Sequence, residues 1–166
     1  MQIRDGGLLV RAPYGTPLSE IERIISGNRS WVEKQLKKAA EQRENALPPF
    51  TAEELKELSD RAAEYLPQRV RYYAPIVGVE PKKIAIRSQR TKWGSCSAKG
   101  TISFNCILML APPGTVDAVV VHELCHLKRM DHSPAFYAEV TRVLPDYKER
   151  DKWLKKNGSA LFARMR

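Results

Sequence analysis

The chain has 166 residues, of which 43% are hydrophobic, and its formal net charge is +9. This length suits one domain, or one domain with an appendage, and the hydrophobic fraction is sufficient for a folded core. No stretch approaches the roughly 20 apolar residues of a membrane helix, and the first residues lack the apolar segment of a secretory signal. The three cysteines are odd in number and form no C-x-x-C pair, so we expect free thiols and a cytoplasmic protein.

Residues 1–47 are expected to form an N-terminal segment of one hairpin and two helices. The prolines of Leu47-Pro48-Pro49-Phe50 predict a stiff connector after it. The predicted elements are a hairpin over Gln2–Ala12 with its turn at Gly6-Gly7, a helix that Thr16 and Pro17 begin and Gly27-Asn28 ends, and a helix from about Ser30 to Glu44.

Residues 51–158 are expected to form a mixed α+β domain, followed by a C-terminal tail over 159–166. Thr51 and Glu54 have the spacing of a capping box, and Pro67 is expected to kink the helix that they begin or to divide it in two. The later elements are strands over Lys83–Ser88 and Thr101–Asn105 with a polar loop (Gln89–Gly100) between them, and helices from about Val116 to Arg129, from Ser133-Pro134, and from a capping Asp146 to Asn157-Gly158.

The motif H-E-x-x-H occupies residues 122–126 within the helix expected at 116–129. Two residues four apart lie on one face of a helix, so the imidazoles of His122 and His126 can share one metal ion. Glu123 lies beside them and is placed to act on a water molecule as the general base. All three histidines of the chain fall between His122 and His132. Two unrelated histidines in a buried helix would be costly, so a metal site is favoured.

The third metal ligand is expected to be His132, because a catalytic zinc has three protein ligands and one open position. A continuous helix would turn His132 away from His126, so the helix must end between them. Pro134 and Asp131 favour such a turn. Glu139 on the following helix is the alternative ligand. The prediction is therefore one zinc ion per chain.

The basic excess, 28 Lys and Arg against 19 Asp and Glu, is spread along the chain. Scattered charge is typical of a solvated surface, and it also fits attraction to nucleic acid or to a phosphorylated ligand. Charge alone does not separate these interpretations.

Four motifs occur in an order that resembles a known family. They are Arg90-x-x-Trp93-Gly94-Ser95-Cys96, Ile102-x-Phe104-Asn105, His122-Glu123-Leu124-Cys125-His126 and His132-Ser133-Pro134-Ala135-Phe136. Together they resemble the YgjP-type metal-dependent hydrolases, often labelled metallopeptidases, which are related to the SprT and WLM zincins. The resemblance implies a compact zincin-like fold with a small sheet, an active-site helix, and a following helix that brings in the third histidine.

The resemblance also implies a peptidase in which Glu123 activates a water molecule at the zinc and an edge strand receives an extended polypeptide. Thr101–Asn105 is the candidate edge strand, and Asn105 is a candidate substrate contact. Tyr137, Tyr147 and Arg142 are candidates for stabilising an oxyanion. Two alternatives remain: a nucleotide phosphohydrolase that uses the same site with Arg87, Arg90 and Lys92 holding phosphate, and a DNA-associated module with a mainly structural metal. The sequence favours a polypeptide substrate, leaves a nucleotide or nucleic acid possible, and leaves the oligomeric state open.

Overall fold

The computed structural model of the chain describes residues 1–4, 7–44 and 47–165. It divides into two compact units, residues 1–47 and 48–166. In the first unit, strands β1 (Gln2–Arg4) and β2 (Gly7–Leu9) pair antiparallel, and helices α1 (Leu18–Gly27) and α2 (Arg29–Glu44) follow. The hairpin is therefore present, although Gly6 of the expected turn lies outside the described residues.

The expected start of the first helix is wrong by one residue. Pro17 occupies the N-cap position and α1 begins at Leu18. The hydroxyl of Thr16 donates to the carbonyl of Pro13 at 2.8 Å instead of capping the helix. Thr16 therefore stabilises the turn before the helix.

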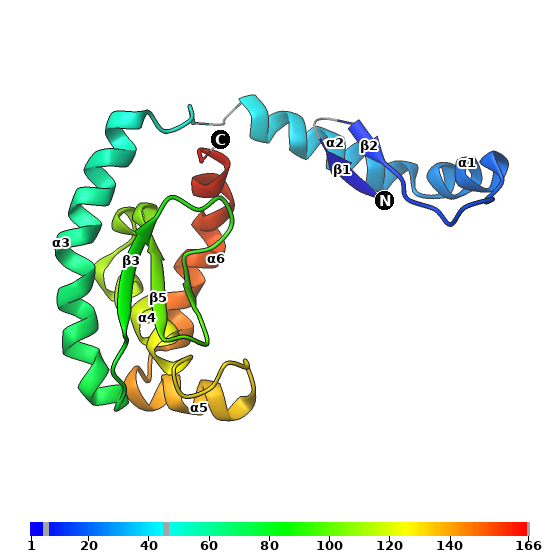
Figure 1. Cartoon of the computed structure of the whole chain (residues 1–166). Coiled ribbons are helices and arrows are strands. Elements are labelled where there is room, and N and C mark those ends of the chain that lie inside the picture. Colours follow the sequence, from blue (N-terminus) through cyan, green and yellow to red (C-terminus); the bar gives the residue numbers. More distant parts are fainter. Residues whose placement is uncertain (5–6, 45–46, 166) are drawn as a thin grey trace. The chain divides into compact units, whose positions relative to one another are not determined.

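The second unit contains the expected mixture of helices and a small sheet (Figure 1). Its elements are α3 (Ala52–Val77), β3 (Lys83–Arg87), β4 (Gly94–Cys96), β5 (Thr101–Asn105), the 3-10 helix η1 (Cys106–Leu110), α4 (Pro113–Cys125), α5 (Pro134–Val143) and α6 (Tyr147–Ala163). Among the described residues, no helix combines the length and the apolar character that crossing a membrane would need.

Helix α3 is continuous, so a division at Pro67 is wrong, while the alternative of a kink there stays a prediction. Its capping box is confirmed, because the backbone amide of Thr51 donates to Glu54 at 2.8 Å and that of Glu54 donates to the Thr51 hydroxyl at 3.1 Å. Proline removes one backbone donor, but Leu66 and Val70 on either side of Pro67 are buried in the core. Packing therefore holds the helix through the proline.

The sheet has the strand order β3-β5-β4, with β5 parallel to β3 and antiparallel to β4. The loop expected over Gln89–Gly100 therefore contains a strand that the sequence did not indicate. Thr101–Asn105 is the central strand and not an edge, so the expectation that it receives a polypeptide is wrong. Strand β4 is the edge on that side.

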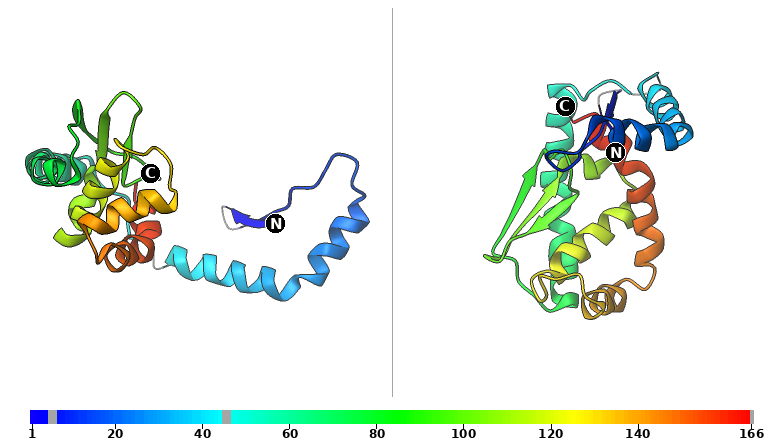
Figure 2. Two further views of the ribbon diagram at one scale, coloured as in Figure 1. Left: turned by 90° about the horizontal axis from the view of Figure 1, so that it is seen from below. Right: turned by 90° about the vertical axis from the view of Figure 1, so that its right-hand side faces the viewer.

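Helix α4 lies at the centre of the second unit. Figures 1 and 2 show it between the sheet with α3 on one side and α6 on the other. It begins at Pro113 and ends at Cys125, earlier at both ends than the expected 116–129. The run from Val116 to Val121 is buried throughout, as expected for a helix enclosed on all sides.

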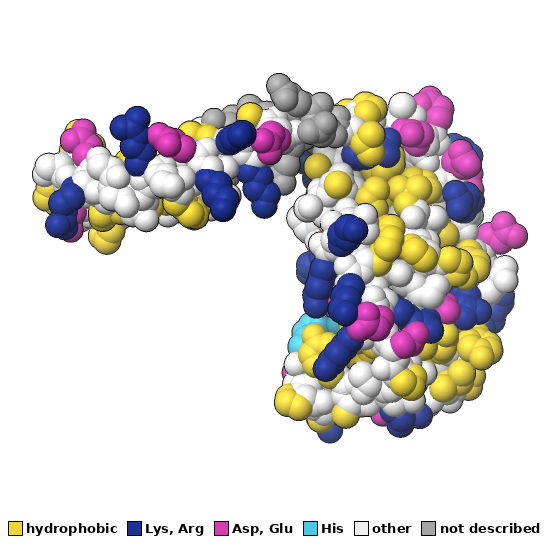
Figure 3. All heavy atoms as spheres, turned by 180° about the vertical axis from the view of Figure 1, so that it is seen from behind, with side chains coloured by type: hydrophobic (Ala, Val, Ile, Leu, Met, Phe, Trp, Pro, Cys, Tyr) yellow, Lys and Arg dark blue, Asp and Glu magenta, His cyan; other side chains and the backbone are white. Residues whose placement is uncertain are grey.

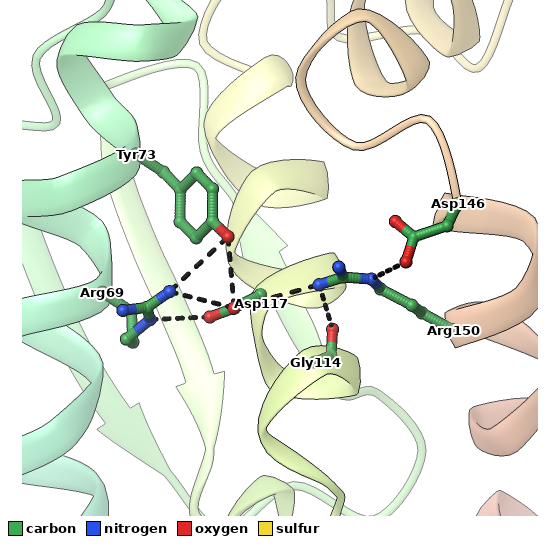
Figure 4. A network of polar contacts seen from close by, with 6 residues as sticks. All are labelled: Arg69, Tyr73, Gly114, Asp117, Asp146 and Arg150. Carbon is green, nitrogen blue, oxygen red and sulfur yellow. Dashed lines mark hydrogen bonds and ion pairs between the residues drawn. The ribbon is translucent and has the colours of Figure 1, made fainter.

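A buried polar network joins α3, α4 and α6 (Figure 4). The carboxylate of Asp117 on α4 accepts two hydrogen bonds from Arg69, at 2.7 and 2.9 Å, and one from the hydroxyl of Tyr73 at 3.1 Å. From α6, Arg150 donates to the carbonyl of Gly114 at 3.1 Å. Helix α4 is thereby held by charged groups from the helices on both sides.

Helix α6 continues to Ala163, so the expected end at Asn157-Gly158 and the expected tail over 159–166 are wrong. Gly158 is buried in the middle of the helix, and the ring of Trp93 lies over it. Asp146 precedes the helix but makes no capping hydrogen bond, because its carboxylate accepts from Arg150 at 2.8 Å. The two ends of the second unit lie next to each other, since the amide of Phe50 donates to the carbonyl of Arg164 at 2.9 Å.

Candidate metal centre

Helix α4 presents two histidines from its last turn. His122 lies in the helix and His126 at its C-cap, with the amide of His126 donating to the carbonyl of His122 at 3.3 Å. The four-residue spacing places both rings on one face. His126 is only 8% exposed, so its polar ring requires partners inside the protein.

His132 reaches the same point from the segment after α4. The helix ends at Cys125, as the ligand geometry requires, and the chain turns back before α5. Ser133 caps α5 by accepting from the amide of Phe136, with Pro134 as the first helical residue. The Ser133 hydroxyl also donates to Asp131 at 2.9 Å. These contacts fix the end of the turn that carries His132.

The Nε2 atoms of the three histidines converge. That of His122 lies 3.1 Å from that of His126 and 3.2 Å from that of His132. Tetrahedral zinc with Zn–N bonds of about 2.0–2.1 Å places its ligand nitrogens roughly 3.3 Å apart. The three residues form a group whose donor atoms suit one metal ion.

The other ring nitrogens are occupied. Nδ1 of His126 lies 2.9 Å from the carbonyl oxygen of Arg129, which can only accept, so this nitrogen carries the proton. Nδ1 of His122 lies 2.9 Å from the hydroxyl oxygen of Tyr147. Burial lowers the pKa of His122 to about 4 and also lowers that of His126, so both rings are neutral at pH 7. Neutral imidazoles with free Nε2 lone pairs that face one another fit a cation.

Glu139, the alternative third ligand, lies outside the cluster. Its carboxylate accepts from Lys128 at 2.7 Å and from Arg142 at 2.8 Å. Hydrogen bonds from Arg142 and Lys128 lower its pKa to about 2. The charge of the Glu139 carboxylate is therefore already neutralised by two cations within the protein. His132 is the residue that joins the other two histidines.

Glu123 is buried beside the histidines with one oxygen unpartnered. The residue is 5% exposed, and within the described part of the chain its buried Oε2 has no hydrogen-bond partner. Burial raises its pKa to about 8, against the opposing charge of Lys92. Glu123 also lines a cavity, so its carboxylate is suited to bind a water molecule or a substrate group there.

Gly94 provides the space for this carboxylate. A Cβ atom at Gly94 would lie 2.7 Å from Oε1 and 2.8 Å from Cγ of Glu123, which is closer than real contacts. The glycine of the Trp93-Gly94-Ser95-Cys96 motif is therefore required by close approach and not by backbone conformation. A glycine within a strand often marks such an approach, but the sequence did not give this signal because residues 89–100 were expected to form a loop.

A cavity of about 420 Å³ opens over the cluster. The histidines and Glu123 form its floor, edge strand β4 forms one wall, and Tyr147, Asp151 and Leu154 of α6 form part of another. Ala118 and Val119, one turn before His122, add apolar surface. A histidine side chain is visible at the surface in Figure 3.

The proposed substrate-binding residues are not brought together at this cavity. Asn105 is 1% exposed and donates to the carbonyls of Gln89 and Lys92 at 2.6 and 2.9 Å, while its oxygen accepts from Ile107. Its amide is used to hold the loop before β4, so it has no group left for a substrate. Arg142 is bound to Glu139 and to the carbonyl of Ile76 at 3.0 Å, and it lines a different cavity. Tyr137 is 41% exposed, with its ring centroid 6.2 Å from that of His132.

This fold and site define a zincin-like metallopeptidase, in which a buried helix and the following turn supply three histidines and a carboxylate. The chain belongs to the YgjP-like metallopeptidase family, whose domain matches residues 1–60 and 51–157. It is similar to the crystal structure of the metallopeptidase zymogen abylysin of Pyrococcus abyssi, with 26% identity and a TM-score of 0.50 over 55% of this chain and 93% of that one. No curated protein matches the chain.

Proposed function

We propose that the protein is a zinc peptidase that holds one zinc ion through Nε2 of His122, His126 and His132. The observation that carries this proposal is the convergence of three imidazole nitrogens at 3.1 and 3.2 Å beside a carboxylate with one unpartnered oxygen. Three histidines leave a fourth, open coordination position, which is typical of catalytic rather than structural zinc.

The chain's own groups supply the proton transfers. A bound zinc ion supplies Lewis acidity, which polarises a carbonyl and lowers the pKa of a coordinated water to about 7. Glu123 takes a proton from the attacking water and returns it to the leaving amine. Burial raises the pKa of Glu123 to about 8, so this side chain binds the transferred proton strongly. The positive charge of a bound metal would keep it ionised before that transfer.

Strand β4 is proposed as the surface that receives the substrate backbone. It pairs with β5 on one side only, within the described sheet, and it forms a wall of the cavity. An extended polypeptide adds to such an edge through main-chain hydrogen bonds, which brings its carbonyls past the site irrespective of sequence. We expect an unfolded or extended segment to be cleaved. All three cysteines are free thiols, which supports the proposal of a cytoplasmic protein.

The variant Glu123→Gln tests the function. It keeps the shape of the side chain but removes the base, so zinc content should be unchanged while cleavage of an unfolded protein falls by at least about a hundredfold. The zinc-loaded protein should also be assayed with nucleoside triphosphates. Phosphate release that disappears with Glu123→Gln, without peptide cleavage by the parent, would replace the peptidase proposal by the phosphohydrolase alternative.

A further inference from the structure

The segment 81–116 carries six cations and no acidic residue. It comprises the whole sheet, the loops between its strands and the start of α4. We call these cations the basic strip: Lys82, Lys83, Arg87, Arg90, Lys92 and Lys99. All six are exposed. An unbroken run of one sign is unusual in a chain whose remaining residues contain 22 Lys and Arg (28 − 6) and all 19 Asp and Glu.

The basic strip is not neutralised within the protein. In the part of the chain that the structure describes, none of its six side chains forms a hydrogen bond or an ion pair. Helix α6 differs, because Lys152 pairs with Glu149 at 2.8 Å and Lys155 pairs with Asp151 at 2.6 Å. On the face in Figure 3, cations and acids are likewise interspersed. The positive charge of the basic strip is thus not compensated by side chains within the described structure.

One member of the basic strip borders the candidate metal centre. Lys92 lines the cavity and lies close enough to Glu123 to oppose the rise in its pKa. Lys92 and Lys99 lie on either side of β4 in the chain. Both ends of the strand that is proposed to receive the substrate are therefore positively charged. On β3, Ile84 and Ile86 pack against the core, which leaves Lys83 and Arg87 on the opposite face of the sheet.

We propose that the basic strip selects polypeptide segments rich in Asp and Glu on either side of the cleaved bond. This inference rests on the proposed peptidase function and on β4 as the substrate strand. A segment bound along β4 passes Lys92 at one end and Lys99 at the other. Opposite charges attract the segment before contact and like charges repel it, so a basic segment is disfavoured at the same edge.

A polypeptide fits this surface better than a nucleic acid does. Single-stranded nucleic acids are usually held by aromatic side chains on which bases stack. Segment 81–116 offers no row of exposed rings, because Phe104 is fully buried and the only other aromatic residue, Trp93, packs against Phe162 with ring centroids 4.7 Å apart. The backbone of an edge strand, in contrast, pairs directly with a peptide backbone.

The test uses the full-length zinc-loaded protein and three quenched fluorescent peptide libraries. Each has the same four randomised central positions, flanked on both sides by three Glu, three Gln or three Lys. At low ionic strength, kcat/KM for the Glu library should exceed that for the Gln library by at least about tenfold, and the Lys library should be cleaved more slowly than the Gln library. At about 0.5 M salt the preference should largely disappear, because the Debye length is then only about 4 Å.

The double variant Lys92→Gln/Lys99→Gln should reduce the ratio of Glu to Gln cleavage to below about threefold. The matched control Lys56→Gln/Lys152→Gln removes the same charge from paired lysines outside the basic strip and should keep the ratio. Using a ratio removes any general effect of Lys92 on Glu123. Binding of the uncleaved Glu library to Glu123→Gln, followed by fluorescence anisotropy, should show the same charge preference without catalysis.

The outcomes separate the two proposals. Cleavage of the Gln library with a Glu to Gln ratio near one overturns the selection of acidic segments and leaves the peptidase function standing. Failure to cleave any library, with no preferential binding to Glu123→Gln, counts against both. Loss of single-stranded DNA binding in Lys92→Gln/Lys99→Gln, with no effect on peptide ratios, would assign the basic strip to nucleic acid instead.

Discussion

The hydroxyl oxygen of Tyr147 lies 2.9 Å from Nδ1 of His122, on the side of the imidazole away from the other two histidines. Tyr147 is 8% exposed, and burial raises its pKa, so the phenol stays protonated and neutral. By accepting a hydrogen bond from Nδ1–H, the Tyr147 hydroxyl would hold His122 in the tautomer whose Nε2 is free for the metal.

We therefore expect Tyr147→Phe to weaken zinc binding by about 10–100-fold without unfolding the protein. Competition with a zinc chelator measures this affinity, and circular dichroism checks the fold. Tyr137→Phe removes a hydroxyl from a partly exposed tyrosine nearby and should leave the affinity unchanged. Equal affinities for Tyr147→Phe and the parent protein would show that the hydrogen bond does not position the ligand.

His132→Ala should lower the zinc content of the purified protein strongly, because it removes one of three converging nitrogens. Glu139→Gln should keep near-stoichiometric zinc, since the Glu139 carboxylate is already held by Lys128 and Arg142. Elemental analysis of protein prepared without added metal measures both variants. The opposite pattern would make Glu139 the third ligand.

Gly94→Ala should impair catalysis while zinc is retained. Its new methyl group would lie 2.7 Å from Oε1 of Glu123, so the carboxylate must move away from its position. A displaced base should reduce kcat by at least about tenfold, because proton transfer requires hydrogen-bonding distance. Gly27→Ala is the control, since nothing lies within 4 Å of the added atom. Unchanged kcat in Gly94→Ala would mean that strand β4 moves to make room for the methyl group and Glu123 keeps its position.

The metal-free protein should lose stability as the pH rises toward 8. Burial raises the pKa of Glu123 to about 8, so the folded state binds a proton that the unfolded state releases near pH 4.5. The associated stability is present below about pH 4.5 and is lost as the pH passes through about 8. The size of this pKa shift sets an upper value of roughly 5 kcal/mol for the loss in the free energy of unfolding. Glu123→Gln does not titrate, so the melting temperature of the variant relative to the metal-free parent should rise from about pH 5 to about pH 8 and level off above that. A difference in melting temperature that does not change with pH would argue against a raised pKa of Glu123.

Asp117→Asn should destabilise the protein by about 2–3 kcal/mol, because Arg69 would then lie half-buried without its counter-charge. Urea denaturation measures the change. Asp60→Asn breaks the pair with Lys56, in which both side chains are well exposed, and should have little effect. Similar destabilisation by the two variants would show that the network in Figure 4 contributes no more than a surface pair.

The convergence of the three histidines was predictable from sequence because it depends on local spacing. The four-residue interval of H-E-x-x-H fixes two rings on one helical face, and the need to end the helix before His132 follows from helix geometry alone. The capping box at Thr51 and the N-cap at Ser133 are equally local, and both are present.

The errors arose where contacts distant in sequence outweigh local preference. Strand β4 has only three residues, of weak strand preference, and exists because β5 pairs with it. Helix α6 passes through Asn157-Gly158 because Trp93 packs over the glycine. A polar residue at the end of a strand, such as Asn105, gives no sign whether it faces a substrate or its own backbone.

The hydrogen bond between Phe50 and Arg164 brings the two ends of the second unit together. Arg164 also donates to the carbonyl of Pro48 at 2.8 Å. A folding unit whose ends adjoin is a self-contained module in the evolutionary sense. It can be joined to different neighbours, inserted into a loop of another protein, or circularly permuted, without moving the helix that bears the histidines.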